Sequence, residues 1–369
     1  MRKASLRRGA AALVLAVLAL PALPGAALAA PAYPFQNPRL PLERRVDDLV
    51  GRLTLDEKIS LLHQYQPAIP RLGIKLFKAG TEALHGVAWS NDADNGGAVV
   101  TATATSFPQP VGLASTWDPA LLRRVGSVVG DEARGHNALN DRVWGLNLWA
   151  PVVNPLRDPR WGRNEEGYSE DPLLTGAIST AYGRGLTGDD PRYLKTAPTL
   201  KHYLAYNNET GRDVTSSNVP QRVLNEYERA AFKPALRAGA ATGVMSSYNL
   251  INGRPATVDP DLGGLLRSWS DKPLFNVSDA YAPYNLTGSQ QYFATSPRPP
   301  RRCSRPATTA SRSTTTTGSP PWTPSRLRSP GDCSPRTTST RPPGTRSASG
   351  SASASSTRTA ARTRRSART

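Results

Sequence analysis

The segment 31–296 contains no cysteine, because both cysteines of the chain, Cys303 and Cys333, lie beyond it. This absence excludes disulfide bonds and cysteine-ligated metal sites from the segment, so its stability must come from burial of a hydrophobic core. A segment of about 265 residues is long enough to form one large domain. We therefore predict a single folded domain over residues 31–296.

The last 73 residues, 297–369, lack most of the residue types from which a core is built. They contain no Lys, Glu, Ile, Val, Phe, Tyr or Met, and their only large apolar residues are Trp322 and Leu327. Most of them are Arg, Ser, Thr or Pro, with 15, 15, 15 and 11 residues respectively. Such a composition is typical of disordered chains. We predict a low-complexity, disordered C-terminal tail.

The net charge of +18 comes entirely from the two ends of the chain. The tail contributes +14 and four basic residues near the N-terminus contribute +4, so the segment 31–296 is neutral, with 27 basic and 27 acidic side chains. Basic arms often bind nucleic acid, but such arms normally mix Lys with Arg. Arg without Lys, beside abundant Ser, Thr and Pro, is what a GC-rich gene yields when it is read out of frame. We favour that interpretation, which translation of the other two frames after codon 297 would test, and we predict no nucleic-acid partner.

The N-terminus has the pattern of a secretory signal peptide. Four positive charges within residues 2–8 precede an apolar run from Ala10 to Leu23, and Ala27-Leu28-Ala29 places small residues where a signal peptidase reads them. A transmembrane anchor is the alternative, but the run is shorter than the ~20 residues that span a bilayer. We predict a signal peptide over residues 1–30 with cleavage near Ala29 or Ala30, secretion of the chain, and no membrane partner.

Helical and strand-like segments alternate along residues 31–296. Leu42, Val46, Leu49, Val50 and Leu53 recur at helical spacing, and Thr54 followed by Glu57 forms a capping box that opens a second helix. Further helices are predicted over 119–139, 172–186, 221–238 and 259–269, and strands over 146–153, 196–202, 242–248 and 274–278.

This alternation, with no sign of hairpins, predicts an α/β fold with a parallel sheet. Polar or ionisable residues follow the strands at Asn154, Lys201-His202, Tyr248 and Asp279, and the C-terminal ends of barrel strands are where active sites form. We therefore favour a TIM-like (β/α)8 barrel that is incomplete at its last strand. A doubly wound open sheet is the alternative, although no G-x-G-x-x-G or Walker-type loop follows a strand.

Each candidate site residue also has a simpler structural interpretation. A strand-terminal Asp such as Asp279 often forms a turn or caps a helix. Lys201 and His202 could be a salt bridge and a core histidine. Arg157, Arg160 and Arg163, which alternate with acidic residues, would by default form a surface ion-pair network. Glu82 and His85 could lie in a solvated loop.

Taken together, five motifs resemble those of glycoside hydrolase family 3, the retaining β-glycosidases with an N-terminal TIM-like barrel. The resemblance covers residues 45–296, and the order and spacing of the motifs make it specific. The motifs are Glu82-Ala83-Leu84-His85-Gly86, Arg157-Asp158-Pro159-Arg160-Trp161-Gly162-Arg163-Asn164-Glu165-Glu166-Gly167, Lys201-His202-Tyr203, Met245-Ser246-Ser247-Tyr248-Asn249 with Asn252-Gly253, and Val277-Ser278-Asp279.

The resemblance implies that Asp279 is the nucleophile, which forms a covalent glycosyl-enzyme that water hydrolyses with retention. Arg163, Lys201 and His202 match the residues that bind hydroxyl groups of the reacting sugar, and Tyr248 matches a tyrosine beside the nucleophile. We expect neighbouring cations to keep the pKa of Asp279 low. No cofactor and no metal are implied. The residue after the nucleophile, often Trp in the family's glucosidases, is Ala280 here.

The residue at Glu82 is Asp in many family members. Glu is one methylene longer and would crowd the hydroxymethyl group that a hexose carries at C5, so we expect Glu82 to line the sugar pocket and to favour xylosides. A methylene discriminates by only ~1–3 kcal/mol, so both β-xylosidase and β-glucosidase activity stay open, on an oligosaccharide or aryl β-glycoside substrate.

A retaining mechanism also needs a second carboxyl group, ~5–5.5 Å from the first, as general acid and base. Most of the family takes it from a second domain, and one branch takes it from an Asp-His pair after the Lys-His motif. Here the loop 208–218 has no histidine and the segment 297–369 has no Glu. We therefore predict a secreted glycosidase that lacks its general acid in this chain and is impaired. The alternative is a non-catalytic secreted carbohydrate-binding or interaction protein with a basic disordered tail.

Overall fold

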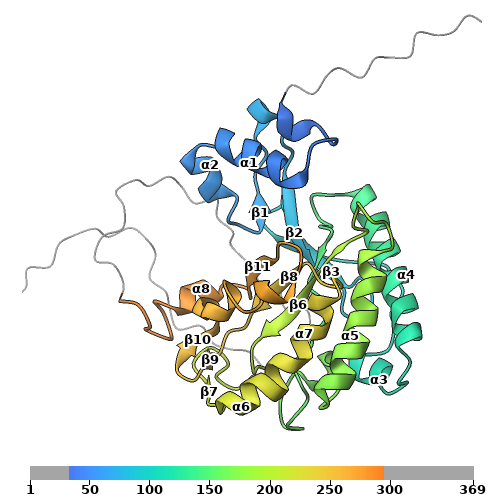
Figure 1. The fold of residues 1–369 in the computed structure, drawn as a ribbon, viewed down its shortest axis with the longest axis vertical. Helices are drawn as coiled ribbons and strands as arrows, with labels where there is room; N and C mark the ends of the chain where they lie inside the picture. The colour runs from blue at the N-terminus through green and yellow to red at the C-terminus, as the bar shows by residue number, and fades with distance from the viewer. Residues whose placement is uncertain (1–32, 295–369) are drawn as a thin grey trace, which may run out of the picture. The chain divides into compact units, whose positions relative to one another are not determined.

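The computed structural model describes residues 33–294, drawn in colour in Figure 1. The predicted signal peptide (1–30), the predicted tail (297–369) and any barrel strand within that tail lie outside the described residues. The sequence predictions that the structure can address are therefore those for the folded domain.

A six-stranded sheet organises this domain. Five of its strands are parallel neighbours in the order β2-β5-β6-β8-β11, and β1 pairs antiparallel with β2 at one edge. The strands are β1 (Tyr65–Gln66), β2 (Phe77–Thr81), β5 (Asn147–Leu148), β6 (Ala197–Tyr203), β8 (Gly243–Ser246) and β11 (Phe275–Ser278). The predicted parallel α/β architecture is confirmed. Within the described residues the sheet is open, with edges at β1 and β11, instead of closed over eight strands.

Three helical segments connect consecutive parallel strands. They are α4 (Pro119–Leu139), α5 (Pro172–Thr187), and a continuous segment made of α6 (Gln221–Val223), a π-helical turn over Leu224–Glu228 and α7 (Arg229–Arg237). Figure 1 shows α4, α5 and α7 side by side along the same face of the sheet. This is the layout of a barrel wall, because a doubly wound sheet would carry helices on both faces.

The long helices begin where the sequence predicts, and their caps explain why. The carboxylate of Asp118 accepts a hydrogen bond from the N–H of Leu121 (3.0 Å) at the start of α4. The carboxylate of Asp171 accepts one from the N–H of Leu173 (2.8 Å) at the start of α5. Each cap is followed by a proline at the first helical position, which lacks the N–H that would have no partner there.

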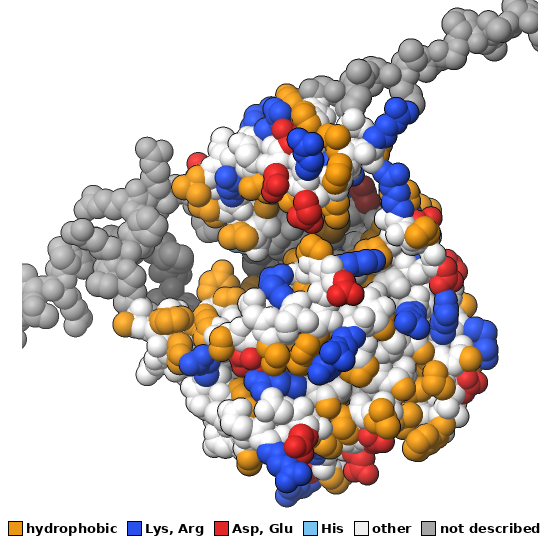
Figure 2. Space-filling model, in the orientation of Figure 1, with side chains coloured by type: hydrophobic (Ala, Val, Ile, Leu, Met, Phe, Trp, Pro, Cys, Tyr) orange, Lys and Arg blue, Asp and Glu red, His pale blue; other side chains and the backbone are white. Residues whose placement is uncertain are grey.

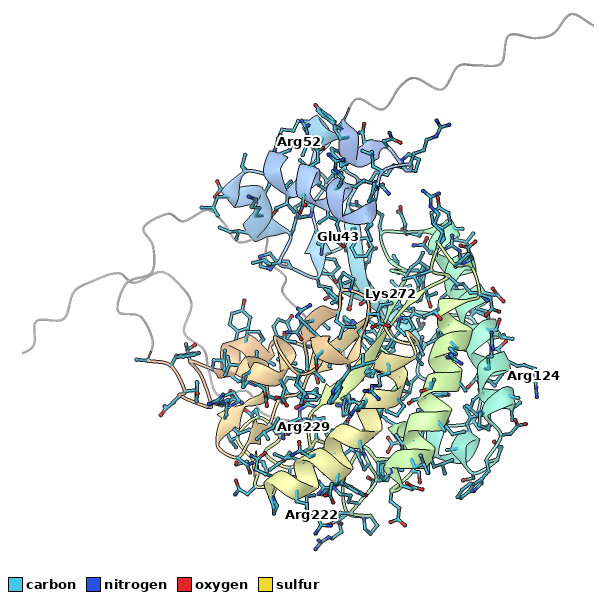
Figure 3. All side chains as sticks on the ribbon, viewed as in Figure 1. Glu43, Arg52, Arg124, Arg222, Arg229 and Lys272 are labelled. Atoms are coloured by element: carbon cyan, nitrogen blue, oxygen red, sulfur yellow. The ribbon has the colours of Figure 1, made fainter. Side chains whose placement is uncertain are left out.

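Helices α4 and α5 pack so closely that glycine is required at their contact. A Cβ atom on Gly126 would lie 2.3 Å from the carbonyl oxygen of Tyr182, and one on Gly185 would lie 2.3 Å from that of Arg123. Both helices cover a core that includes the fully buried Leu122, Val129, Leu148, Ile178 and Tyr182. Figure 3 shows Arg124 of α4 and Arg222 of α6 extending outward from their helices, away from the sheet.

The two N-terminal helices, α1 (Leu42–Arg52) and α2 (Leu55–Ser60), form as predicted. The capping box is present, since Thr54 Oγ1 accepts from Glu57 N–H (3.2 Å) and the Glu57 carboxylate accepts from Thr54 N–H (2.9 Å). The apolar face of α1 is less buried than its pattern indicates, and only Leu53, just after the helix, is buried with Phe35, Ile69 and Leu72.

Short antiparallel pairs correct the prediction that hairpins are absent. Strands β3 (Trp89–Asp92) and β4 (Ala98–Thr101) form a hairpin whose turn contains Gly96 and Gly97 with positive φ. Strand β9 (Leu250–Ile251) pairs antiparallel with β10 (Arg254–Pro255) and parallel with β7 (Ser216–Ser217). These strands of two to four residues are too short to give a clear period-2 pattern.

The other differences are local. The predicted helix 259–269 is replaced by 3-10 turns at Pro260–Leu262 and Arg267–Trp269, because the two glycines between them disfavour a continuous helix. Short helices α3 (Pro110–Ala114) and α8 (Ala282–Asn285) and strand β2 were not predicted. On the face shown in Figure 2, Lys and Arg are interspersed with Asp and Glu, in line with the neutral charge of the segment.

Candidate active site

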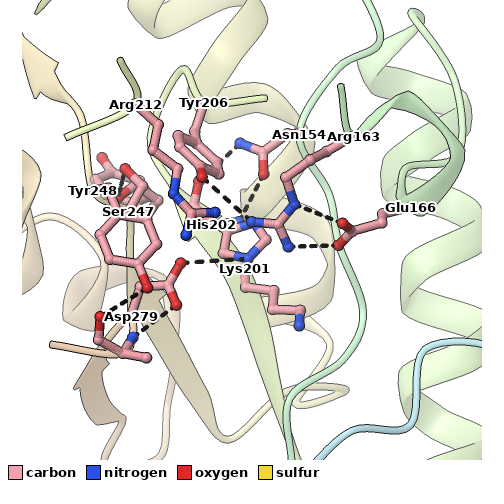
Figure 4. A network of polar contacts seen from close by, with 12 residues as sticks. Asn154, Arg163, Glu166, Lys201, His202, Tyr206, Arg212, Ser247, Tyr248 and Asp279 are labelled. Carbon is pink, nitrogen blue, oxygen red and sulfur yellow. Dashed lines mark hydrogen bonds and ion pairs between the residues drawn. The ribbon is translucent and has the colours of Figure 1, made fainter. Parts of the chain in front are cut away.

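The parallel strands bring the predicted site residues to one end of the sheet. Glu82 directly follows β2, Lys201 and His202 lie near the end of β6, and Asp279 directly follows β11. Tyr248 follows β8 by two residues, and Arg163 lies in the loop between β5 and α5. Figure 4 shows Asp279, Tyr248 and Arg212 on one side of His202, and Arg163 with Glu166 on the other. All the predicted residues thus lie at the C-terminal ends of five neighbouring strands, the face that carries the active site in barrel enzymes.

Asp279 presents one carboxylate oxygen without a hydrogen-bond partner. Its side chain is 15% exposed, and its Oδ2 lies 3.8 Å from Nε2 of His202. The other oxygen, Oδ1, accepts a hydrogen bond from the N–H of Ala280 (2.8 Å). Oδ2 is buried and has no hydrogen-bond partner among the described residues. An unpaired buried carboxylate oxygen is costly, which is typical of functional sites.

Burial raises the pKa of the Asp279 carboxyl above its ordinary value. The N–H of Ala280 and the charges of Lys201 and Arg163 act in the opposite direction but do not cancel the loss of hydration. The expectation that neighbouring cations hold this pKa low is therefore wrong in its net direction. The extent of that burial depends on how segments far apart in the chain pack around Asp279, which the sequence could not show.

This raised pKa predicts that Asp279→Asn increases thermal stability at neutral pH. Between its unfolded pKa of ~3.9 and the higher folded pKa, the folded state binds more protons, so stability falls as pH rises through that window. At pH 7 the folded protein therefore carries a desolvation cost that an amide avoids. We expect a higher Tm for Asp279→Asn at pH 7 and a smaller difference near pH 4, measured by thermal unfolding. The exposed Asp271→Asn is the control, and a lower Tm for Asp279→Asn at pH 7 would contradict the argument.

A buried ion pair links the ends of β2 and β6. Lys201 is 4% exposed, and its Nζ lies 3.0 Å from Oε2 of Glu82. A buried Lys needs such a partner, because removing its charge from water is costly. The structure thus unites two residues that are 119 positions apart, and Glu82 is not the solvated loop residue of the simpler interpretation.

His202 is fully buried and held by its backbone. The side chain of Asn154 accepts a hydrogen bond from the His202 N–H (2.7 Å) and donates one to its carbonyl oxygen (2.8 Å). The ring packs edge-on against Tyr206 at 5.1 Å between centroids. Burial, assisted by the charges of Arg163, Lys201 and Arg212, lowers the pKa of His202 well below its usual value. The imidazole is therefore neutral, and its Nδ1 has no partner among the described residues.

Arg163 is held by a two-point contact with Glu166, with N–O distances of 2.6 and 2.7 Å. Both side chains are mostly buried, at 16% and 19% exposed, and Arg163 also lies 3.4 Å from the hydroxyl of Tyr206. The surface-network interpretation is thus wrong for this pair. It holds for the pair of Arg160 with Asp158, where Arg160 is 87% exposed.

Several polar residues around Asp279 and His202 were not predicted from the sequence. The guanidinium of Arg212 lies 4.5 Å from the centre of the Tyr248 ring and 3.0 Å from Glu209. Tyr206 contacts Glu209 through its hydroxyl (3.1 Å). Arg212, Tyr206 and Glu209 all lie in the loop after Lys201-His202. Their position could have indicated a role in the site, because a loop that follows a site strand emerges at the same face of the sheet. Tyr248 itself donates a hydrogen bond to the carbonyl of Ala280 (2.7 Å), next to Asp279.

The described residues contain neither a cluster of metal ligands nor a membrane-spanning helix. Residues 33–294 contain no group of three or more His, Cys, Asp or Glu side chains placed to hold a metal ion. Of the helices in that range, none is both long and apolar enough to cross a membrane.

Comparison with known proteins identifies the domain. The family model described as "Glycosyl hydrolase family 3 N terminal domain" matches residues 71–281, which is more than half of the chain. The chain belongs to glycoside hydrolase family 3. The N-terminal domain of this family is a TIM-like barrel, and the curled, helix-covered sheet of the described residues agrees with that fold.

Its relatives include plant and microbial glycosidases. The chain is 40% identical over 242 residues to "Probable beta-D-xylosidase 7" of Arabidopsis thaliana, covering 62% of this chain and 31% of that protein. It is 38% identical over 271 residues to "Beta-xylosidase/alpha-L-arabinofuranosidase 2" of Medicago sativa subsp. varia, covering 71% of this chain and 35% of that protein.

Solved structures agree with these relatives. A family 3 exo-β-xylosidase in complex with a xylobiose aziridine probe aligns with a TM-score of 0.64 and 30% identity, over 71% of this chain and 34% of that chain. The β-glucosidase DesR of Streptomyces venezuelae, in complex with D-glucose, aligns with a TM-score of 0.54 and 33% identity, over 64% and 29%. The chain thus spans about a third of the length of these relatives.

Proposed function

We propose that this glycoside hydrolase domain binds the reacting sugar of a β-glycoside and carries the nucleophile of a retaining hydrolysis, Asp279. The observation that supports this most directly is the unpaired Oδ2 of Asp279 at the strand ends, facing neutral His202 within the family match. Asp279 would attack the anomeric carbon while the bond to the leaving oxygen breaks. Water then hydrolyses the glycosyl ester and regenerates the carboxylate.

Trapping the ester tests this proposal. A 2-deoxy-2-fluoro-β-xyloside with a dinitrophenyl leaving group should glycosylate the chain, because its leaving group departs without protonation. Intact mass spectrometry should show the addition of one fluoroxylosyl group, and peptide mapping should place it on Asp279. Labelling of another carboxylate, or none at all in folded protein, would contradict the assignment.

The surrounding residues would orient the sugar. Glu82 and Lys201 form one pair, and Arg163 with Glu166 forms another, so charged donors and acceptors are fixed in place before substrate arrives. Charge-assisted hydrogen bonds from such groups to sugar hydroxyls give orientation as well as affinity. The buried, neutral His202 would add a hydrogen bond without competing for the charge of Asp279.

We propose β-xylosides as the preferred substrate, with β-glucosides as the second candidate. The relatives named above include β-xylosidases, and Glu82 is held at the end of β2 by Lys201. A carboxylate fixed there, one methylene longer than Asp, would leave less room for the C5 hydroxymethyl group of a hexose.

Glu82→Asp is therefore expected to shift selectivity toward glucosides. The variant should lower the xyloside-to-glucoside ratio of kcat/KM by roughly 10-fold, which is the discrimination expected from the space of one methylene group. Dinitrophenyl β-xyloside and β-glucoside are the substrates for the measurement. Glu166→Asp is the matched control, because it shortens a carboxylate that pairs with Arg163. An unchanged ratio in Glu82→Asp would remove Glu82 from the sugar pocket.

We also propose the division of the chain into a signal peptide over 1–30, the barrel domain over 31–296 and a tail over 297–369 that is not part of the catalytic domain. The family match over 71–281 lies wholly within the middle segment, and the loss of core-forming residue types begins at 297. Secretion with cleavage near Ala29 or Ala30 follows from the N-terminal pattern. N-terminal sequencing of the exported protein tests the cleavage site.

A further inference from the structure

A carboxylate lies on the buried face of a helical segment that otherwise presents apolar residues to the core. Glu228 is 1% exposed, and it is the last residue of the π-helical turn between α6 and α7. The other buried residues of this segment include Leu224, Phe232 and Leu236. Burial raises the pKa of the Glu228 carboxyl above its ordinary value, because a charge loses hydration there. Stability alone does not explain this residue, since apolar replacement of a buried ion pair is often neutral or stabilising.

The partner of Glu228 is Arg157, in the loop between β5 and α5. Nε of Arg157 lies 3.0 Å from Oε1 of Glu228. This oxygen accepts no hydrogen bond among the described residues, so charge holds the pair together without hydrogen-bond geometry. The guanidinium carbon of Arg157 also lies 4.9 Å from the ring centre of Trp161 and 6.0 Å from that of Tyr227. Arg157 is therefore contacted by the helix through Glu228 and Tyr227, and by its own loop through Trp161.

A second contact joins the same helical segment to the same loop. The hydroxyl of Tyr227 donates a hydrogen bond to the carbonyl oxygen of Glu170, which lies at the end of the loop just before α5. The two contacts thus start from adjacent residues of the helical segment and meet the loop at positions 157 and 170. Between these positions lies Arg163 with its partner Glu166. The place of Arg163 therefore depends on how the helical segment holds both ends of the loop.

This loop has little regular structure of its own. From residue 157 to residue 171 it contains one regular element, the 3-10 turn Asn164–Glu166. A segment with few regular backbone hydrogen bonds opens more readily than the elements that flank it. Helix α7 is by contrast fixed to the core through the fully buried Phe232, Ala235 and Leu236. A well-packed helix thus supports a loop that carries a residue of the candidate active site, and such support sets how accurately a site residue is placed.

We propose that Glu228 and Arg157 are positioning residues, which fix the loop between β5 and α5 so that Arg163 meets the hydroxyl groups of the reacting sugar. The inference rests on the proposed function, in which Arg163 orients that sugar. Glu228 is buried and does not reach the substrate, so it acts through Arg157 and the loop. Loss of this support should weaken binding of the ground state and of the transition state alike, which raises KM and leaves kcat nearly unchanged.

Glu228→Gln in the full chain tests the pair, because it removes the charge and keeps the size of the side chain. The cation that it leaves, Arg157, is 30% exposed and can be hydrated, so we expect the variant to fold. KM for a dinitrophenyl β-xyloside should rise at least about 10-fold while kcat changes less than about 3-fold. Glu228→Asp, which keeps the charge, should recover part of the loss. The matched control is Glu226→Gln in the same π-helical turn, where the side chain is 63% exposed; it should leave both constants unchanged.

Two further measurements separate positioning from a general loss of structure. In an Arg163→Ala background, Glu228→Gln should have no further effect on kcat/KM, because a residue that acts through Arg163 then has nothing left to position. Hydrogen exchange of the backbone amides in residues 157–167 should be at least about 10-fold faster in Glu228→Gln than in the unaltered chain, while exchange in α4 stays unchanged. Mass spectrometry of the peptides from these segments gives both rates.

Two results would overturn the proposal. One is unchanged hydrogen exchange in residues 157–167 of the Glu228→Gln variant. The other is an equal loss of kcat/KM from Glu228→Gln with and without Arg163, which would show that Glu228 does not act through Arg163. Hydrogen exchange is measured without substrate, so it decides whether the pair fixes the loop even if the unaltered chain hydrolyses no xyloside. That absence of hydrolysis would contradict the proposed function, and the two failures are therefore distinguishable.

Discussion

Asp279→Asn is expected to lower kcat/KM for a dinitrophenyl β-xyloside by at least about 10⁴-fold, because loss of a covalent nucleophile typically costs that much or more. An amide is nearly the same size as the carboxylate but cannot form the glycosyl ester. The activated substrate is chosen because its leaving group needs no proton, so the assay reports the attack of Asp279 alone. The rate is followed by release of dinitrophenol.

The matched control is Asp271→Asn, which makes the same change at an exposed residue just before β11. It should retain full activity. Asp279→Ala with added azide then separates a nucleophile from a positioning residue, since azide can enter the vacated space and attack the anomeric carbon from the same face. Formation of α-xylosyl azide is expected. Substantial residual activity in Asp279→Asn would place the nucleophile at another residue, whereas the absence of activity in the unaltered chain would favour the non-catalytic alternative.

The same substitution should have opposite effects on activity and stability. Burial of Asp279 raises its pKa, so the folded state carries the cost of a desolvated charge at neutral pH. A residue that is costly to the fold yet essential to the reaction is what a stability–activity trade-off predicts. If Asp279 had only a structural role, its substitution would lower the stability of the protein. Measuring both activity and stability is therefore more informative than measuring either one alone.

Strand ends were the most predictable part of this site. The segments that end in Lys201-His202 and Asp279 are apolar and bounded by turn residues, so their strands and the polar residues after them could be placed from the sequence. In a parallel sheet such ends share one edge, which is why residues far apart in the chain meet. Glu82 was harder to place, because β2 contains the buried but polar Lys78 and Thr81 and does not read as a strand.

The ion pairs of the site were its least predictable feature. The motif around Arg163 offers several carboxylates within a few residues, and the sequence gives no reason to prefer Glu166 for the two-point contact. The neighbouring Arg157 instead lies 3.0 Å from the buried Glu228, which is 71 positions away. Which cation meets which carboxylate depends on how the loop after β5 folds back. The direction of the pKa shift of Asp279 is predicted wrongly for a different reason, because burial of its carboxyl outweighs the effect of Lys201 and Arg163.

The second large effect concerns the leaving group. Each carboxylate around Asp279 that the site contains is paired with a cation: Glu82 with Lys201, Glu166 with Arg163, and Glu209 with Arg212. Among the described residues, the network thus offers no free carboxyl group to protonate a departing oxygen. General acid catalysis contributes typically about 10²–10⁴-fold, and substrates with poor leaving groups depend on it most.

The chain is therefore expected to show an unusually steep dependence on the leaving group. Its ratio of kcat/KM for dinitrophenyl β-xyloside to that for xylobiose should exceed the ratio of a full-length family 3 β-xylosidase, assayed alongside, by about 10²–10⁴-fold. Equal ratios would mean that this chain supplies its own acid, and Glu166→Gln and Glu209→Gln would then identify it by a selective loss of xylobiose hydrolysis. If the chain lacks the acid, both variants should affect the two substrates alike, because a residue that only positions the sugar acts before the leaving group departs.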